Sequence, residues 1–128
     1  MNNLYNYNGT IGTLKDSNFN GYNRAFKYGD GIIETIRIFD SKPIFFENHY
    51  SRIQRSSEVL QFDIPNISDK RIFEEIKVLC SSSKISNGVV RLEVYRTGGG
   101  AYIPESNSVD FLMSISELND DLFKLNDL

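Results

Sequence analysis

The sequence is poor in the residues that crosslink a chain or hold a metal. Its 128 residues include one cysteine, one histidine and no tryptophan. A lone cysteine excludes an internal disulfide, and one histidine with one cysteine is too small a ligand set for a typical zinc site. Because Cys80 falls on an apolar helical stripe, we expect it to be a small buried hydrophobic residue rather than a nucleophile.

Cationic runs and long apolar segments are also absent from the sequence. The formal net charge of -3 gives no electrostatic basis for nucleic-acid binding, and no run of lysine or arginine favours a membrane surface. No apolar stretch approaches the length of a membrane span, and the N-terminus has neither the basic region nor the apolar core of a signal peptide. We therefore predict a cytoplasmic protein with no nucleic-acid or membrane partner.

The composition that remains is typical of one globular domain. Hydrophobic residues make up 40% of the chain and charged residues 24%, which is enough for one core at this length and leaves no room for a second domain. Residues 117–128 are acidic with spaced leucines and are expected to begin an interdomain linker, so the domain is predicted to span 1–116.

The segment 28–52 organises the rest of the chain. Gly29-Asp30-Gly31 predicts a sharp turn, because glycine takes positive φ without a penalty. A strand should follow, with Ile32, Ile36 and Ile38 on one face and Ile33, Thr35, Arg37 and Phe39 on the other. Both faces are largely apolar, so we expect both to be covered. After a polar break at 40–42, residues 43–46 are predicted to return as the second strand of a hairpin.

Beyond this hairpin, the apolar spacing indicates a helix that ends near Gln61. Its stripe is Phe46, Tyr50, Ile53, Ser57 and Leu60, and Asn48 is the expected N-cap. Arg52 falls at the edge of the apolar face, whereas Arg55 points nearly opposite it, so only Arg52 is expected to reach a pocket rim. Spacing alone favours a solvated Arg52 and a core His49 over functional roles for either.

The remaining pattern predicts an α+β domain. A hairpin is expected from residues 4–7 and 10–14 around Asn8-Gly9, followed by a loop at 15–23 and a helical turn at 24–28. A second helix should be capped by Ser68 or Asp69, and strands are expected at 89–96 and 109–115, with Arg91 and Glu93 on one face. The stripe of the second helix is Ile72, Phe73, Ile76, Leu79 and Cys80. Thr97 and the glycines at 98–100 lack the Lys-Ser/Thr of a nucleotide P-loop, so a turn is the better interpretation.

Several of these segments together resemble the class IV, or fold type IV, pyridoxal-phosphate aminotransferases. That family includes branched-chain and D-amino acid aminotransferases and aminodeoxychorismate lyase. The segments that carry the resemblance occur in family order and spacing, and are YGDGIIETIR at 28–37, KP at 42–43, ENHYSRI at 47–53 and SSE at 56–58. The glycine-rich turn after the strand at 89–96 looks most like the lyase. The resemblance implies a mostly antiparallel sheet with two helices on one face, the small N-terminal domain of the D-amino acid aminotransferase-like fold.

The resemblance also implies roles for individual residues. Arg52 matches the arginine that binds the phosphate of pyridoxal 5'-phosphate, and its planar fork suits phosphate oxygens. His49 is the motif residue that positions the helix, and Gly29, Asp30 and Gly31 form the structural turn. Arg91 is a candidate for holding the substrate carboxylate, although an ion pair with Glu93 is equally consistent with the sequence.

Ile33 occupies a substrate-facing position where relatives often carry Tyr or Phe, so the type of substrate cannot be transferred from them. The lysine that forms the Schiff base and the glutamate that faces the pyridine nitrogen belong to the larger second domain of such enzymes. No lysine here matches that motif, so the chain carries half of an active site.

Three functional hypotheses follow from these observations. The leading one is the N-terminal domain of a pyridoxal-phosphate-dependent aminotransferase or aminodeoxychorismate lyase, which acts on an amino acid or on aminodeoxychorismate. The 128-residue chain would be inactive alone and would form a homodimer or a higher oligomer. The alternative is a stand-alone binding or interaction module derived from that domain. A nucleotide-binding domain is a weaker third hypothesis.

Overall fold

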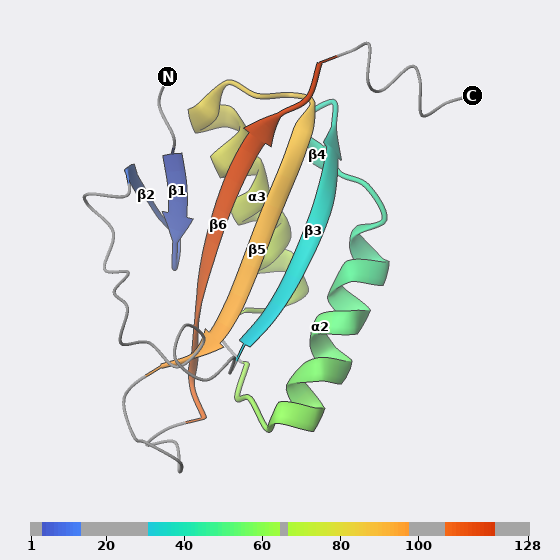
Figure 1. The fold of residues 1–128 in the computed structure, drawn as a ribbon, viewed down its shortest axis with the longest axis vertical. Coiled ribbons are helices and arrows are strands. Elements are labelled where there is room, and N and C mark those ends of the chain that lie inside the picture. The colour runs from blue at the N-terminus through green and yellow to red at the C-terminus, as the bar shows by residue number, and fades with distance from the viewer. Residues whose placement is uncertain (1–3, 14–30, 65–66, 98–106, 120–128) are drawn as a thin grey trace.

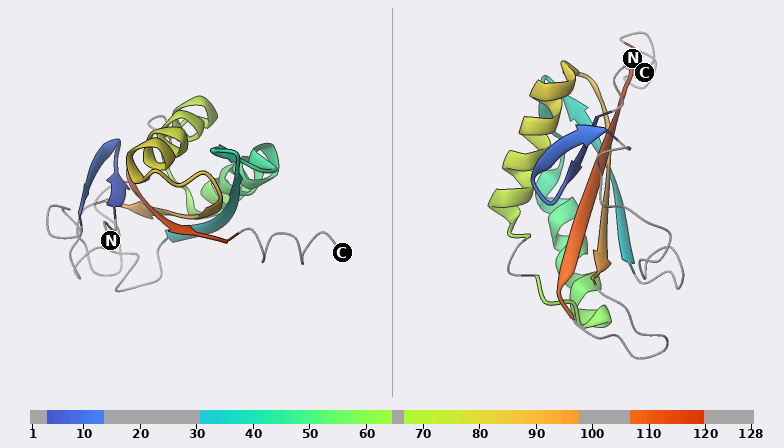
Figure 2. Two further views of the ribbon diagram at one scale, coloured as in Figure 1. Left: turned by 90° about the horizontal axis from the view of Figure 1, so that it is seen from above. Right: turned by 90° about the vertical axis from the view of Figure 1, so that its left-hand side faces the viewer.

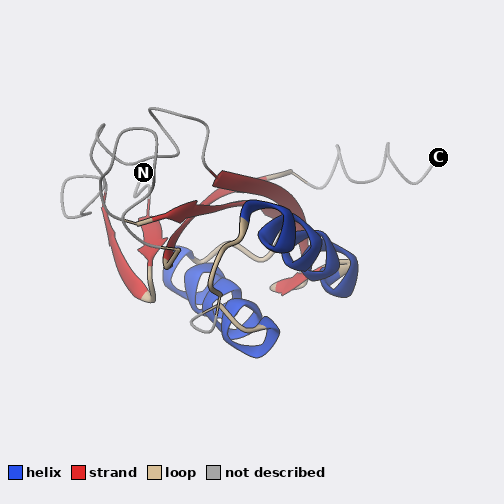
Figure 3. Cartoon of the chain, turned by 90° about the horizontal axis from the view of Figure 1, so that it is seen from below, coloured by secondary structure: helices blue, strands red, loops and turns tan. Residues whose placement is uncertain are grey.

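The computed structural model describes residues 4–13, 31–64, 67–97 and 107–119, which form one sheet and two helices. The strands are β1 (Leu4–Tyr7), β2 (Thr10–Thr13), β3 (Gly31–Phe39), β4 (Lys42–Pro43), β5 (Gly88–Arg96) and β6 (Val109–Glu117). They are arranged in the order β2-β1-β6-β5-β3-β4, and every neighbouring pair is antiparallel. Helices α2 (Phe46–Leu60) and α3 (Asp69–Ser83) cover one face of this sheet (Figures 1, 2 and 3). The α+β architecture predicted from the sequence is confirmed.

The core lies between the helices and the inner face of β3, β5 and β6. Strand alternation sends every second side chain of these strands into it, and the helical stripes supply the other layer. The buried side chains include Ile36, Ile38, Val90, Leu92, Phe111 and Met113 from the sheet and Ile53, Ile72, Ile76, Leu79 and Cys80 from the helices. Burial of each large aliphatic side chain contributes about 1.5–3 kcal/mol. Both predicted stripes are thus confirmed, as is the buried position of Cys80.

Two tight turns fix the register of the hairpins. Asn8 and Gly9 have φ of 52° and 93°, and Asp40 and Ser41 have φ of 53° and 62°. Positive φ at both central residues is the backbone of a type I′ turn, whose twist matches that of the flanking strands. The hairpin predicted around Asn8-Gly9 is therefore confirmed.

The start of α2 corrects two predictions. Phe45 adopts φ of 56° and serves as the N-cap without a side-chain hydrogen bond, so the helix begins at Phe46 and Asn48 lies inside its first turn. The second hairpin strand is shorter than predicted for the same reason. It spans only Lys42–Pro43, because the backbone turns at Phe45. In contrast, Ser68 caps α3 as predicted, since its hydroxyl accepts a hydrogen bond from the Arg71 amide at 3.2 Å.

The outer face of the sheet is covered at some positions and open at others. Tyr95 and Leu112 are buried, whereas Ile33 and Phe39 are exposed. The expectation that β3 is covered on both faces is therefore not met by the described residues of this chain. The helices cover the inner face only (Figure 2).

A few predictions fall on segments that the structure does not describe. These are the loop and helical turn at 15–28, Gly29 and Asp30 of the glycine turn, the glycines at 98–100 and the linker from 120 onward. The proposed domain boundary at 116 stays a prediction. Neither of the two described helices is long and apolar enough to cross a membrane.

Candidate functional site

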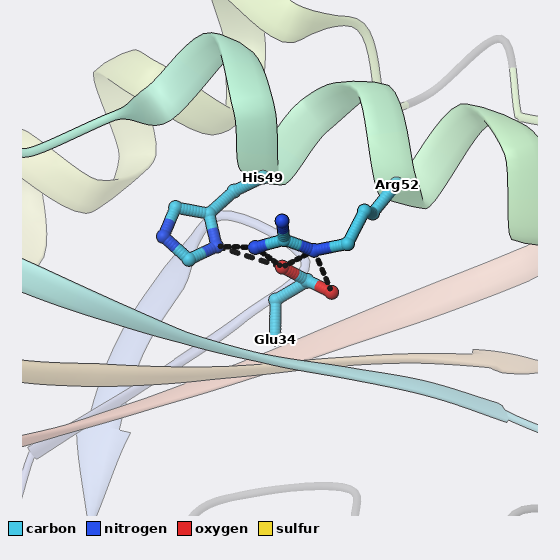
Figure 4. Close-up of polar contacts among 3 residues, drawn as sticks. All are labelled: Glu34, His49 and Arg52. Carbon is cyan, nitrogen blue, oxygen red and sulfur yellow. Dashed lines mark hydrogen bonds and ion pairs between the residues drawn. The ribbon is translucent and has the colours of Figure 1, made fainter.

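A carboxylate on β3 meets two side chains of α2 between the sheet and the helix. Glu34 lies between Ile32 and Ile36 on the same face of the strand, so alternation directs it toward the helix rather than toward solvent. His49 and Arg52 lie one turn apart on α2, and both reach down to that carboxylate (Figure 4). The cluster joins residues that are distant in sequence, and it connects β3 to α2.

The Glu34 carboxylate accepts hydrogen bonds from both partners. Arg52 donates from Nη2 to Oε1 at 3.0 Å, and its Nε lies 3.2 Å from Oε1 and 3.4 Å from Oε2. The Nδ1 atom of His49 lies 2.7 Å from Oε1. Glu34 is only 11% exposed, whereas the Arg52 side chain is 48% exposed. Arg52 therefore bridges a largely buried anion and the protein surface.

The tautomer of the His49 ring is assigned from the groups around Nδ1. Nδ1 lies 2.7 Å from the Glu34 oxygen and 3.0 Å from Nη2 of Arg52, which can only donate. An unprotonated Nδ1 would place its lone pair against a carboxylate at the shorter of the two distances. We therefore assign the proton to Nδ1, from which it is donated to Glu34. His49 thus contacts the carboxylate that also accepts hydrogen bonds from Arg52, and its positioning role stays a prediction.

A groove of about 460 Å³ runs between the first residues of β3 and the second half of α2. We call it the β3–α2 groove. It is lined by Gly31, Ile32, Ile33, Glu34, Arg52, Arg55, Ser56, Val59 and Leu60. Nη1 of Arg52 donates to no described residue, so this nitrogen is available to a ligand.

Arg55 does not occupy the place that the helical pattern predicted. It lines the β3–α2 groove beside Arg52 instead of pointing away from it. Residues three apart on a helix are neighbours on its surface, and a long arginine side chain can follow the groove even when its Cβ lies off the apolar stripe. The prediction that only Arg52 reaches the rim is therefore wrong.

A second hollow, of about 540 Å³, lies at the N-terminal ends of α2 and α3. Of the described residues, Phe45, Phe46 and Phe73 line it, together with Glu47, Asp69 and one cation, Lys70. Two carboxylates against one ammonium disfavour an anionic ligand there. The β3–α2 groove is thus the better candidate for a phosphate.

Arg91 lies on the other side of the sheet from Arg52. It projects from the outer face of β5, and its Nε lies 3.1 Å from Oε1 of Glu93. The ion pair that the sequence left open is therefore formed. Ile33 pairs in register with Glu93 and also lines the β3–α2 groove, so Ile33 links the groove to the face that carries Arg91.

Glu34 is the site residue that sequence reasoning missed. Its signal was present, since a carboxylate that alternates with Ile32 and Ile36 on a core-facing side requires a cationic partner.

Gly31 begins β3 and lines the groove, while Gly29 and Asp30 are outside the described residues.

Cys80 is buried in α3 and does not line the β3–α2 groove. Burial raises the pKa of the Cys80 thiol, which keeps it protonated and unreactive. Within the described ranges, no group of three histidine, cysteine or acidic side chains is placed to hold a metal ion.

Comparison with known proteins identifies the family of the chain. The family described as amino-transferase class IV matches residues 31–127 of the chain. The chain belongs to this family. D-alanine aminotransferase from Staphylococcus epidermidis is 28% identical over 89 residues, which are 70% of this chain and 31% of that enzyme. Aminodeoxychorismate lyase from Bacillus subtilis is 27% identical over 92 residues, which are 72% of this chain and 31% of the lyase.

A solved class IV structure has the same fold. The branched-chain amino acid aminotransferase from Escherichia coli superposes with a TM-score of 0.78 at 18% identity, over 92% of this chain and 42% of that one. The chain thus spans about a third of the length of the curated class IV relatives it matches, and it has the fold of their N-terminal domain. Aminotransferases of this class depend on pyridoxal phosphate.

Proposed function

We propose that this chain is the N-terminal domain of a pyridoxal-phosphate-dependent aminotransferase or aminodeoxychorismate lyase, and that Arg52 supplies a contact to the cofactor phosphate. The observation that carries the proposal is the hydrogen bonding of the Arg52 guanidinium. Two of its nitrogens are engaged by the buried Glu34, while Nη1 is left without a described partner at the β3–α2 groove. A guanidinium that is oriented in advance loses less entropy when it binds phosphate.

The residues present fit a phosphate ester. Among the described residues, the β3–α2 groove carries two guanidinium groups, the Ser56 hydroxyl and one carboxylate, and that carboxylate is already occupied by Arg52 and His49. When bound, pyridoxal phosphate supplies the electron sink that the chemistry of amino acids requires. The part of Glu34 and His49 is to hold Arg52 in place and to keep water from competing for its Nε and Nη2.

We propose that Arg91 and Ile33 contact the substrate. Both lie on the outer face of the sheet, where Arg91 would exchange its exposed partner Glu93 for the carboxylate of an amino acid or of aminodeoxychorismate. An ion pair this exposed is worth at most about 1 kcal/mol, so a substrate carboxylate can displace it at little cost. The aliphatic Ile33 would set the shape of the substrate pocket. We further propose that the parent enzyme is a homodimer in the cytoplasm.

The parent reading frame tests the proposal directly. We expect it to continue past Leu128 into a segment with a lysine-bearing strand, because the chain spans about 31% of its curated relatives. A reading frame that stops at Leu128 would favour the stand-alone binding module, which keeps the fold without the chemistry.

The 128-residue chain should also lack transaminase and lyase turnover by itself, because no lysine in it matches the Schiff-base position. The measurement is incubation with pyridoxal phosphate, borohydride reduction and peptide mapping. Stoichiometric fixation of the cofactor to one lysine would contradict this expectation.

A further inference from the structure

The β3–α2 groove contains a second arginine, to which the proposed function assigns no specific contact. Arg55 lines the groove three residues after Arg52. It is exposed and forms no ion pair or hydrogen bond with any described residue, although Glu58 follows one turn later on the same helix. A surface arginine with a nearby carboxylate and no pairing to it is free to bind an external anion.

The charges around the groove favour that anion. Among the described residues, those that line the groove carry two positive side chains and one negative side chain, an excess of one positive charge on a protein whose formal net charge is -3. Glu34 is held by Arg52 and His49, so it compensates Arg52 but not Arg55. Positive potential is thus concentrated in one hollow of an acidic protein.

The spacing of the donors suits a phosphate group. Side chains at i and i+3 of a helix have Cβ atoms roughly 5–6 Å apart, so two guanidinium groups can converge on one tetrahedral anion from the same side. Ser56 adds a hydroxyl in the same groove, and it has no hydrogen-bond partner among the described residues. A phosphate monoester carries a charge of about -1.5 to -2 at neutral pH, which one guanidinium does not neutralise.

We propose that Arg55 is a second phosphate-binding residue, and that Arg52 and Arg55 together hold the phosphate dianion in the β3–α2 groove of this chain alone. The inference rests on the proposed function, because it assigns Arg55 to the same phosphate that Arg52 contacts. Arg52 is fixed by a buried carboxylate and sets the position of the anion. Arg55 is paired with no residue that the structure describes, and it closes over the anion from the solvent side.

The experiment is a titration of the 128-residue chain with pyridoxal phosphate, inorganic phosphate and pyridoxal. Backbone amide shifts of α2 and β3 report binding and show that each variant is folded. We compare wild type with Arg52→Gln, Arg55→Gln, Arg55→Lys and Lys77→Gln. Lys77 is an exposed cation on α3, so its variant makes the same change in net charge away from the groove.

We expect Arg55→Gln to weaken binding of pyridoxal phosphate and of inorganic phosphate by roughly tenfold, the factor that about 1.4 kcal/mol produces. Arg55→Lys should recover part of that loss because it restores the charge but not the fork. Lys77→Gln should bind both anions as wild type does, and pyridoxal should bind equally to all variants.

Three results would overturn the inference. If Arg55→Gln binds phosphate as tightly as Lys77→Gln while Arg52→Gln is weakened, Arg55 is excluded and the proposed function stands. If neither arginine variant differs from Lys77→Gln, the assignment of Arg52 fails as well. If wild type shows no saturable phosphate-dependent shifts in α2, the groove of this chain is not sufficient for the anion.

Discussion

Two arginine–glutamate ion pairs lie on opposite faces of the same sheet. They differ in how far they are exposed and in the elements that they join. Arg52 and Glu34 join α2 to the inner face of β3, and Glu34 is 11% exposed. Arg91 and Glu93 lie two residues apart on the outer face of β5, where they are 55% and 30% exposed. The first pair connects two elements, whereas the second joins neighbours on a single strand.

The difference shows what burial does to an ion pair. A nearly buried carboxylate loses most of its hydration and must be compensated, so Glu34 fixes the orientation of Arg52. An exposed pair is screened by water and contributes little to stability, so Arg91 can leave Glu93 for a ligand. Arg52 is therefore positioned in advance, as a permanent cofactor would require. Arg91 can exchange its partner, as a transient substrate would require.

Removal of the Glu34 carboxylate is expected to have the largest effect on the stability of the chain. We expect Glu34→Ala to lower the free energy of unfolding by about 2 kcal/mol, less than for a fully buried pair because Arg52 is half exposed. Urea unfolding followed by circular dichroism measures this change. The matched variant Glu93→Ala should cost less than about 0.5 kcal/mol. Equal losses in the two variants would show that Glu34 is not held as described.

A second test uses Tyr95, whose phenol is buried on the outer face of the sheet. Burial, followed by the influence of Tyr7 and Asp110, raises the pKa of Tyr95 far above its usual value of 10.0. The unfolded chain therefore loses that proton first, so the stability associated with the neutral phenol is complete below about pH 10 and declines as the pH rises further. We expect Tyr95→Phe to flatten the decline of unfolding free energy between about pH 9.5 and 11. An unchanged alkaline slope would contradict this assignment.

The weakest expected effect concerns the apolar part of the outer face. Ile33 and Phe39 are 55% and 44% exposed on β3, and the described residues provide no cover for them. We expect the chain to self-associate through this face, and Ile33→Asp with Phe39→Asp to shift it toward monomer in sedimentation or light scattering. Val78→Asp on α3 is the control, because Val78 is exposed to a similar degree on the helix-covered side. A wild-type monomer at crystallisation concentrations would refute the proposal.

The sequence predicted the fold well because local patterns control it. Alternation along β5 and β6 and the apolar stripe of α3 each determine one buried face, and the Asn8-Gly9 turn determines a hairpin register. It failed at Phe45, where a bulky residue takes a backbone conformation that propensity disfavours, and α2 therefore started before the predicted cap at Asn48.

The candidate site was predicted only in part, because it depends on contacts between elements. Helical angles placed Arg52 at the rim but could not show how the flexible Arg55 side chain would lie. The pairing of Arg52 with Glu34 required the packing of α2 on β3, which no local window contains. The Arg91–Glu93 pair was foreseen as an alternative, since both residues belong to one strand.

The affinity of the longer parent protein for pyridoxal phosphate, compared between Arg52→Ala and Arg91→Ala, is the most direct test of the central claim. If Arg52 is the positioned phosphate ligand, its removal should weaken cofactor binding by about 1.5–3 kcal/mol, the worth of a charge-assisted hydrogen bond. Arg91→Ala should leave cofactor affinity within about 0.5 kcal/mol of wild type, because its side chain lies on the opposite face of the sheet. Equal cofactor affinities in the two variants would contradict the assignment of Arg52.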